Sequence, residues 1–478
     1  MPATPSVTGG QLAILEYANR LAARGHQVSV TTYSNSMWSD DDPYPWFKLS
    51  AEIRCFRVRE TPDAKVDGVL RPLPPVHQHA VGSVLFDAQL WPRLIEAMPE
   101  CDLNIATLWS TAFPVYFSRK GKPVYFMQHN EEIFYPMQPE AMMARLSSRM
   151  SYALPIYKVA NSSWLQRQIH ERHGQSIPFS NNGIELKDFN PGQKRSDLDG
   201  IFRVVTYSRP DQWKGFPDAV AAMQRVMERC GNLVEWHVFG YLHPDLPEQN
   251  PYAPYIYHPK LPFSELAQLY ASSDIALCPS WYESFPLPAL EAMASGTSVV
   301  TTAFGTEDYA FHEQNALVVG SRDVDGMAAS ILRLVRDTAL RQRLAEAGRR
   351  TAEGFNWDKA VVDRERILLA IHRGEPGYDI ECSAMLGLFD AQGVSFERAP
   401  LGTVGDASGI YWDGGALYLL HGGVRRHITE AALVPELVRR GFIYLETDPL
   451  DLARTPVGAP VRTAADLPPA SRYAGRPQ

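Results

Sequence analysis

The 478-residue sequence lacks the features that mark several large classes of protein. No apolar stretch reaches the ~18 residues that a membrane-spanning helix needs. No run of lysine and arginine stands out, and the net charge is −8, so a nucleic-acid partner is not expected. The opening residues, MPATPSVTGG, do not combine a charged segment with an apolar one, so they do not resemble a secretory signal.

Cysteine is also scarce, with five residues that are scattered along the chain. None of them forms a CxxC pair or the spacing of a zinc site. Cys101 and Cys278 lie in apolar runs, where buried free thiols are expected. Such cysteine usage is typical of a reducing compartment, which favours a cytoplasmic location.

The length and the apolar fraction predict a globular chain of several domains. A chain of 478 residues is longer than one ordinary hydrophobic core supports and is long enough for two or three domains. The apolar fraction of 45% is ordinary for folded proteins and too high for a disordered chain.

Strand and helix patterns alternate through the first two-thirds of the chain. Residues 10–25 repeat apolar side chains with a helical period and end at a glycine. The pattern pauses at residues 180–200, which are rich in Asn, Gly, Pro and Asp as linkers are. Strands separated by helices indicate parallel sheets covered on both faces. Strands are predicted at 26–33, 101–109, 122–128 and 157–163, and after the pause at 202–208, 235–241, 274–280 and 297–303.

These patterns predict an α/β protein with two sheet domains, 1–190 and 191–374, and a ligand site in the cleft between them. Residues 380–460 carry short β-like runs separated by DGG at 413–415 and HGG at 421–423, which look like hairpin turns, and predict a small β-rich module. Residues 461–478 predict a disordered tail. Because only residues 1–8 precede the first Gly-Gly pair, the first strand is expected to be a stub, or else the true start codon lies upstream.

The stretch SWYESFPLPALEAMASG, residues 280–296, carries the strongest chemical signal. Glu283 falls in a loop, because Pro286 and Pro288 forbid helix before them. A helix from about Pro288 to residue 294 then places Glu291 one turn inside it. Its free backbone N–H groups form an anion site between two carboxylates, which suit the diols of a sugar and a ribose.

Three further features lie where a predicted strand ends or a helix begins. Arg209 and Lys214 follow a strand and would neutralise a diphosphate at the same sheet edge, or else form an ordinary solvated turn. His129 follows a strand of the first domain, and Gly10 lets the backbone approach a ligand closely. On spacing alone each of these is an ordinary loop feature.

Taken together, these motifs resemble family 4 of the retaining glycosyltransferases, over about residues 7–372. SRPDQWKGFPDAV looks like the family's Arg-x4-Lys-Gly segment, and PSWYESFPLPALEAMASG looks like its Glu-x7-Glu segment. The opening GGQLAILEYANRLAARG and the link SNNGIELKDFNP are similar to further family segments, in the same order. Pro286 departs from the pattern, which commonly has glycine there, and it removes one backbone donor.

The resemblance implies the GT-B architecture, two facing Rossmann-like domains, and a nucleotide-sugar donor. It implies that Arg209 and Lys214 bind the donor diphosphate, that Glu283 contacts the donor sugar and that Glu291 holds the ribose. It also implies that His129 approaches the donor sugar and that transfer retains configuration without a metal. The other donor-binding residues implied are Gly10, Ser284, Phe285, Pro286 and Leu287, with the nucleobase near His258, Lys260 and Pro262.

Two other segments leave alternatives open. Residues 140–157 carry Met142, Met143, Met150, Arg145 and Arg149, and form either a peripheral surface for a lipid-linked acceptor or a core-facing helix with methionine filler. The acidic run 40–42 superficially offers a metal site but is interpreted as a solvated loop.

The expected function is transfer of a hexose or deoxyhexose to a hydroxyl of a glycan, glycolipid or polysaccharide precursor. The alternatives are a GT-B-shaped sugar-nucleotide epimerase or phosphorylase, and a non-catalytic carbohydrate- or partner-binding protein in which the C-terminal module is the working part. The donor base, the acceptor and the oligomeric state do not follow from the sequence.

Overall fold

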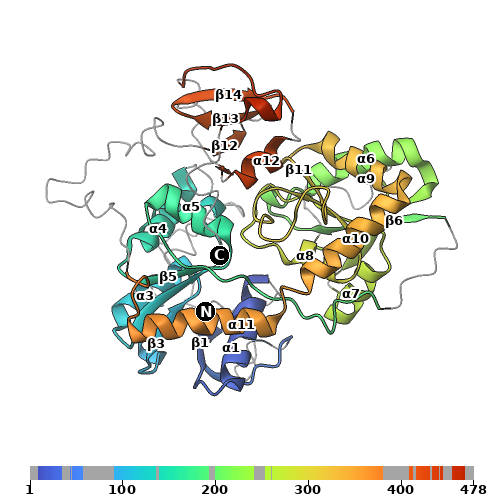
Figure 1. Ribbon diagram of the computed structural model, residues 1–478. Helices are drawn as coiled ribbons and strands as arrows, with labels where there is room; N and C mark the ends of the chain where they lie inside the picture. Colours follow the sequence, from blue (N-terminus) through green and yellow to red (C-terminus); the bar gives the residue numbers. More distant parts are fainter. Residues whose placement is uncertain are drawn as a thin grey trace, which may run out of the picture. The chain divides into compact units, whose positions relative to one another are not determined.

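The computed structural model divides the chain into two compact units (Figure 1). One unit comprises Met1–Asn182 and Trp357–Phe396, and the other comprises Gly183–Asn356 and Glu397–Gln478. The expected stub of the first strand and the acidic run 40–42 lie outside the described residues. The structure describes residues 9–34, 44, 46–57, 91–135, 139–192, 200–241, 253–259, 261–380, 409–412, 416–430, 433–440, 442–444 and 455–468.

The first unit contains two parallel sheets within its described part. Strands β1 and β2 pair with each other, and β3, β4 and β5 form a second sheet in that order. The strands predicted at 26–33, 101–109, 122–128 and 157–163 are present as β1, β3, β4 and β5, and β2 is an addition. The bounds are α1 Gly9–Ala23, β1 Ser29–Ser34, β2 Glu52–Arg57, β3 Leu103–Ala106, α3 Trp109–Ser118, β4 Lys122–Met127, α4 Pro139–Ala153, β5 Tyr157–Ala160 and α5 Ser163–His173.

Helix α11, Trp357–Arg373, belongs to this first unit although it follows the second unit in the sequence. Its Trp357 packs with Tyr17 and Phe126, and its Ile371 packs in a cluster with Val124. The sequence-based boundary at residue 374 placed this helix with the second domain. An amphipathic helix carries no local sign of which sheet it will cover, so chain order was a poor guide here.

The second unit is built on one six-stranded parallel sheet in the order β11-β10-β9-β6-β7-β8. Its strands are β6 Phe202–Ser208, β7 Val234–Gly240, β8 Ile256–Pro259, β9 Ile275–Cys278, β10 Ser298–Thr302 and β11 Leu317–Val319. Its larger helices are α6 Phe216–Cys230, α7 Phe263–Ala271, α8 Leu287–Ala294, α9 Val324–Arg336 and α10 Thr338–Ala352. This matches the predicted alternation closely, with β8 and β11 added.

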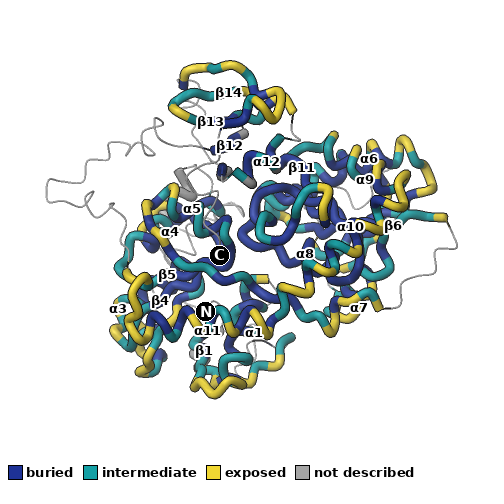
Figure 2. The backbone as a smooth tube through the Cα atoms, viewed as in Figure 1, coloured by how far each residue is buried: buried dark blue, intermediate teal, exposed yellow. Residues whose placement is uncertain are grey.

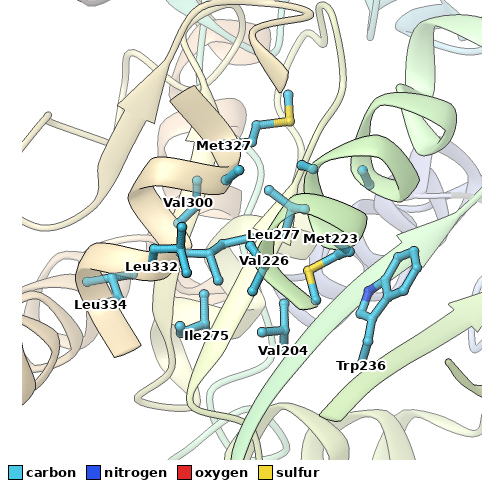
Figure 3. Close-up of a cluster of buried hydrophobic side chains, with 14 of the residues drawn as sticks. Val204, Met223, Val226, Trp236, Ile275, Leu277, Val300, Met327, Leu332 and Leu334 are labelled. Carbon is cyan, nitrogen blue, oxygen red and sulfur yellow. The ribbon is translucent and has the colours of Figure 1, made fainter. Parts of the chain in front are cut away.

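The core of this unit lies between one face of the sheet and helices α6 and α9. Val204, Trp236 and Ile275 from the strands meet Met223 of α6 and Met327 of α9 (Figure 3). Side chains alternate between the two faces of each strand, so Tyr207 and Cys278 lie on the opposite face from Val204 and Leu277. Buried residues fill the centre of the unit, while exposed ones gather on the outer sides of α6, α7 and α10 (Figure 2).

The C-terminal module is a four-stranded sheet in the order β14-β13-β12-β15, with helix α12. Gly422 and Gly423 both have positive φ, 61° and 71°, and form the predicted hairpin turn between β13 and β14. The other predicted turn, Asp413–Gly415, lies outside the described residues. The bounds are β12 Gly409–Trp412, β13 Leu417–His421, β14 Val424–Ile428, α12 Val434–Arg439 and β15 Ile443–Tyr444.

The tail differs from its prediction over residues 461–468. Val461 forms a β-bridge with Ile428, and residues 464–466 form a short 3-10 helix. Arg426 donates hydrogen bonds to the carbonyl oxygens of Ala459 and Asp466, at 2.7 and 2.8 Å. A proline- and alanine-rich composition gives no sign of such bonds, because the arginine that fixes the tail lies more than 30 positions away. Residues 469–478 lie outside the described part.

Candidate functional site

Strand β9 and helix α8 place the two glutamates of the 280–296 stretch as predicted. The strand ends at Cys278, and the helix begins at Leu287 after Pro286, within one residue of the expected start. Glu283 therefore lies in the loop and Glu291 lies in the helix. The loop leaves the sheet at the carboxyl end of β9, which is where ligands bind in open parallel sheets.

One carboxylate oxygen of Glu283 is the centre of the site. Its Oε1 atom accepts hydrogen bonds from Lys214 Nζ at 2.7 Å, Ser280 Oγ at 2.8 Å and Tyr207 OH at 3.2 Å. Glu283 is 8% exposed, so these bonds form in a largely water-excluded place where charge-assisted hydrogen bonds are strong. The structure thus brings together two predicted site residues, Glu283 and Lys214, that are 69 positions apart.

Backbone contacts fix the loops that carry this pair. The backbone N–H of Trp281 donates to the Trp213 carbonyl oxygen at 2.7 Å, which joins the two loops directly. Gly215, at φ 68°, lies so close that a Cβ atom there would be 2.1 Å from the Pro279 carbonyl oxygen. The N–H of Glu283 donates to the Phe304 carbonyl oxygen at 3.2 Å. Three loops, after β6, β9 and β10, therefore form one rigid edge.

Arg209 lies in the loop after β6, two positions beyond Tyr207. Its guanidinium lies over the ring of Tyr241, 5.5 Å from the ring centre. Tyr241 directly follows β7, so the cation is at the carboxyl edge of the sheet as predicted. The half-buried guanidinium is oriented by this ring, since arginine stacks well on aromatic faces.

Glu291 is buried in the first two turns of α8. It is 7% exposed, and burial raises the pKa of its carboxyl to about 8. A carboxyl with that pKa is mostly protonated near neutral pH, so it can donate a hydrogen bond as well as accept one. Such a group suits a hydroxyl-bearing ligand and avoids a charge beside a diphosphate.

The residues between the two glutamates pack against the core of the unit and form a backbone hydrogen bond with it. Phe285 packs edge-on against Tyr309, with ring centres 5.5 Å apart, and also against Phe355. The Pro286 carbonyl oxygen accepts a hydrogen bond from Tyr309 OH at 2.7 Å. Ser284 and Leu287 are buried as well. Among the described residues, the side chain of Phe285 thus holds the loop to the core. Because the side chains of residues 284–287 are buried, a ligand would contact the loop mainly through its backbone groups.

The predicted nucleobase residues lie at the sheet edge formed by β8. His258 Nε2 is 2.9 Å from His237 Nδ1, and His237 Nε2 is 2.7 Å from a carboxylate oxygen of Glu235. Partial burial, with the neighbouring imidazole of His237, lowers the pKa of His258. Pro262 is the residue before α7, and Lys260 lies outside the described residues. The pair of imidazoles is a polar edge on which a base could hydrogen-bond.

The predicted residues of the first unit also lie near each other. His129 follows β4, is buried, and packs against Phe134 and Trp164 with ring centres 4.6 and 5.5 Å apart. Gly10 lies in the first turn of α1, and its carbonyl oxygen accepts a hydrogen bond from Gln128 Nε2 at 2.9 Å. The segment directly before His129 therefore contacts the glycine turn.

Sequence reasoning missed two buried glutamates that follow His129. Glu131 accepts hydrogen bonds from the Trp109 N–H and from Tyr125 OH, at 2.6 and 2.8 Å, and burial raises its pKa to about 8. Burial also acts on Glu132, but the charges of nearby arginines outweigh it and lower the pKa of Glu132 to about 2. These arginines are Arg172 and Arg149, with a further contribution from His173, and Arg145 lies 3.6 Å from the same carboxylate. The only signal in the sequence was the adjacent Glu pair itself, which usually indicates a solvated turn.

This cluster bears on the two alternatives for helix α4. Arg149 donates to Glu132 from two nitrogens, at 3.0 and 3.2 Å, and the buried Arg145 bonds the Tyr135 carbonyl oxygen at 2.7 Å. Both cations therefore face inward. Leu146 and Met150 are the exposed apolar residues, at 39% and 40%. The side chains of Met142 and Met143 are outside the described part.

Of the two cysteines predicted to be buried, one is buried and the other is exposed. Cys278 is buried at the end of β9, and burial raises the pKa of its thiol. Cys101 is exposed, contrary to the expectation, because it precedes β3 outside the sheet and its Sγ lies 3.1 Å from the Lys120 carbonyl oxygen. No three metal-binding side chains gather, and no helix is long and apolar enough to cross a membrane, in the ranges that the structure describes.

A comparison with protein families finds a match within the second unit. Residues 201–337 match the model of the family described as glycosyl transferases group 1. This segment is similar to a glycosyl transferase group 1 domain. It contains Arg209, Lys214, Glu283 and Glu291 together with the predicted donor-binding residues at 284–287, whereas Gly10 and His129 lie outside it. The matched segment is less than a third of the chain.

A curated relative extends the likeness beyond this domain. The O-antigen biosynthesis protein RfbC of Myxococcus xanthus is 26% identical over 320 residues, which cover 65% of this chain. Those residues cover 24% of the relative, so the chain spans about a quarter of its length.

Solved structures of low sequence identity share the fold. The sucrose-phosphate synthase of Thermosynechococcus elongatus matches with a TM-score of 0.59 at 19% identity, covering 77% of this chain and 95% of that one. HepE of Anabaena, in complex with UDP and glucose, matches with a TM-score of 0.55 at 17% identity, covering 77% and 97%. The predicted fold class, GT-B with a small β-rich module, is thereby confirmed.

Proposed function

We propose that this protein is a glycosyltransferase that moves a sugar from a nucleoside diphosphate sugar to an acceptor hydroxyl. The observation that carries the proposal is the contact of Lys214 with Glu283 beside the start of α8, inside the segment that matches the glycosyl transferases group 1 family. A cation and a carboxylate held together at a helix N-terminus supply the two kinds of group that a diphosphate and a sugar require.

In the proposed mechanism, the protein stabilises the departing diphosphate. The ammonium of Lys214 has three donors, of which one lies on Glu283, so the others are available for phosphate oxygens. Arg209 and the free N–H groups at the start of α8 add positive potential at the same edge. These groups counter the charge that develops as the bond breaks, which lets the reaction proceed without a metal.

The bond changes follow from this arrangement. The bond between the anomeric carbon and the diphosphate oxygen breaks, and the acceptor oxygen forms a new bond to that carbon. We propose that the acceptor arrives on the face that the diphosphate leaves, so the configuration is retained and the hydroxyl proton passes to the departing diphosphate. Glu283 holds the sugar hydroxyls, and His129 is proposed to contact the donor sugar as well.

The acceptor and the location stay predictions. We propose a hydroxyl of a glycan, glycolipid or polysaccharide precursor as acceptor and a cytoplasmic location. A peripheral membrane contact through α4 now depends on Leu146 and Met150, because its arginines face inward. Flotation of the protein with phospholipid vesicles tests this contact, and a Met150→Asp variant should lower any binding that the helix provides.

The donor is tested first by binding. A thermal-shift screen of UDP, GDP, dTDP and ADP should show one nucleotide raising the melting temperature, because a ligand of the native state adds stability. UDP-glucose is the first donor to assay, since HepE was solved with UDP and glucose. Activity in excess EDTA then tests metal independence. No shift with any nucleotide would favour the non-catalytic alternative.

The residues are tested by substitution. Glu283→Ala and Lys214→Ala should each lower sugar transfer by about a hundredfold or more, through lost sugar positioning and lost leaving-group stabilisation. The exposed Glu228→Ala on α6 is the matched control and should leave transfer unchanged. Full activity in both site variants would refute the assignment. A product in which the sugar is epimerised, or freed as a sugar phosphate, would instead support the other enzymatic alternatives.

A further inference from the structure

We propose that Tyr207 and Ser280 are positioning residues, which hold the Glu283 carboxylate in place through its Oε1 atom. This inference rests on the proposed function, because it explains how Glu283 keeps its orientation while the donor is bound. Neither residue is part of the Arg-x4-Lys or Glu-x7-Glu pattern, although each lies close to one of them.

The three side chains form a closed hydrogen-bonded group. Tyr207 OH lies 3.2 Å from Glu283 Oε1, Ser280 Oγ lies 2.8 Å from the same atom, and the two hydroxyls are hydrogen-bonded to each other. Tyr207, Ser280 and Glu283 are all less than 10% exposed. A buried hydrogen bond that has no water to replace it costs free energy when it is removed.

The number of hydroxyl hydrogens in this group determines which atoms donate and which accept. The Ser280 hydroxyl has one hydrogen, and donating it to Glu283 leaves the serine oxygen to accept from Tyr207. Burial raises the pKa of Tyr207 well above its usual value, so the phenol stays a donor across the physiological range. The single phenol hydrogen is then shared between the serine oxygen and Glu283 Oε1, so both hydroxyls are directed at the carboxylate, which is the receiving end.

Both hydroxyls are themselves fixed by the sheet. Tyr207 is in β6, next to Phe239 of β7, with ring centres 6.4 Å apart. The Ser280 carbonyl oxygen accepts a hydrogen bond from the hydroxyl of Thr302, the last residue of β10. The group thus connects three strands of the sheet to one carboxylate oxygen, and this rigidity is what a sugar-orienting residue needs.

The third donor to Oε1, Lys214, explains why positioning is needed. In the structure the ammonium lies on Glu283, while the proposed function requires it to serve the diphosphate as well. Lysine is a flexible point charge that cannot fix a carboxylate alone when it turns toward a second anion. Tyr207 and Ser280 then keep Oε1 anchored, so that the other oxygen of Glu283 can receive a sugar hydroxyl.

The test compares Tyr207→Phe and Ser280→Ala with the full-length protein. Each should lower kcat/KM for sugar transfer by about tenfold to a hundredfold, the effect of losing a hydrogen bond to a charged group. Affinity for the nucleoside diphosphate without its sugar should change by less than about twofold, because Glu283 is proposed to contact the sugar. Tyr44→Phe is the matched control: it removes a buried phenol that bonds Thr32 Oγ1 at 3.1 Å in the first unit, and should leave both quantities unchanged.

A double-mutant cycle separates positioning from a structural role. In a Glu283→Ala background, Tyr207→Phe should add less than about a twofold loss, because the tyrosine acts through the carboxylate. An equal loss in both backgrounds would show a merely structural role and overturn the inference. The inference would also be overturned if Glu283→Ala severely lowered kcat/KM for sugar transfer while Tyr207→Phe and Ser280→Ala had no effect. That result would leave the proposed function intact. Unchanged transfer in Glu283→Ala would instead overturn the proposed site.

Discussion

At the scale of single residues, the site depends on glycine where two backbones meet. Gly215 has a left-handed conformation, and it ends the short turn that carries Lys214 and begins helix α6. The same residue leaves room for the Pro279 carbonyl group, four positions before Glu283. A single glycine therefore sets both the direction of the helix and the distance between the lysine and glutamate loops.

Replacing this glycine should separate the two loops. In Gly215→Ala the added Cβ would meet the Pro279 carbonyl oxygen at 2.1 Å, in addition to adopting a positive φ. We expect a loss of stability of roughly 2 kcal/mol or more and a drop in sugar transfer. Gly174→Ala, at the end of α5, is the control, because it has the same left-handed conformation (φ 66°, ψ 17°) but open space around it, and should cost about 1 kcal/mol. Urea unfolding measures both, and equal costs would contradict the contact.

At the scale of elements, the tail is attached to the C-terminal module by arginines of that module. Arg426 bonds the carbonyl oxygens of Ala459 and Asp466, and Arg440 bonds that of Pro468 at 2.9 Å. Strand β14 also exchanges backbone hydrogen bonds with residues 456–461. An arginine offers several donors in a fixed plane, so it can satisfy two carbonyl groups that a neutral side chain could not.

Removing the arginine should loosen the tail alone. In Arg426→Met, amide hydrogen exchange should speed up in residues 456–467, while the strands of the six-stranded sheet keep their protection. Arg425→Met, one position away on the opposite face of β14, is the control and should change exchange less, because Arg425 lies over the ring of Tyr418. Equal exchange rates in both variants would contradict this prediction and would mean that the backbone bridge at Val461 is enough to hold the tail in place.

At the scale of the whole molecule, two buried carboxyl groups make stability depend on pH. Glu131 in the first unit and Glu291 in the second both have a pKa raised to about 8 by burial. A folded-state pKa above the unfolded value of 4.5 means that the folded chain holds the proton more tightly. The stability from this source is complete below pH 4.5 and is lost as the pH rises through 8. Glu132 has a pKa lowered to about 2, so the stability that it contributes is present above pH 4.5 and is lost as the pH falls toward 2.

The free energy of unfolding should therefore fall between pH 6 and pH 9, by an amount on the order of a few kcal/mol. Urea denaturation at pH 6, 7.5 and 9 measures this. Glu131→Gln keeps an acceptor for the Trp109 N–H but cannot ionise, so it should remove the dependence from the first unit and leave that of Glu291. A wild-type profile that stays flat or rises over this range would show that these carboxyls are ionised in the folded state.

The sequence by itself determined the order of the helices and of four of the six sheet strands in the second unit, all but β8 and β11, and the positions of its two glutamates. Apolar runs and the prolines at 286 and 288 are local signals, so they were sufficient to place Glu283 in a loop and Glu291 in a helix. The linker, the hairpin at Gly422–Gly423 and the Arg-x4-Lys turn followed from equally local chemistry.

Only the tertiary structure decided which groups meet. Tyr207 reaches Glu283 across 76 positions, because β6 and β9 are neighbours in the sheet although β7 and β8 lie between them in the sequence. The burial of Glu131 and Glu132 and the return of α11 to the first unit are likewise set by packing between distant segments. Periodicity shows that a face is apolar but not what covers it, so the groups that orient the carboxylate at the site became visible only in the folded chain.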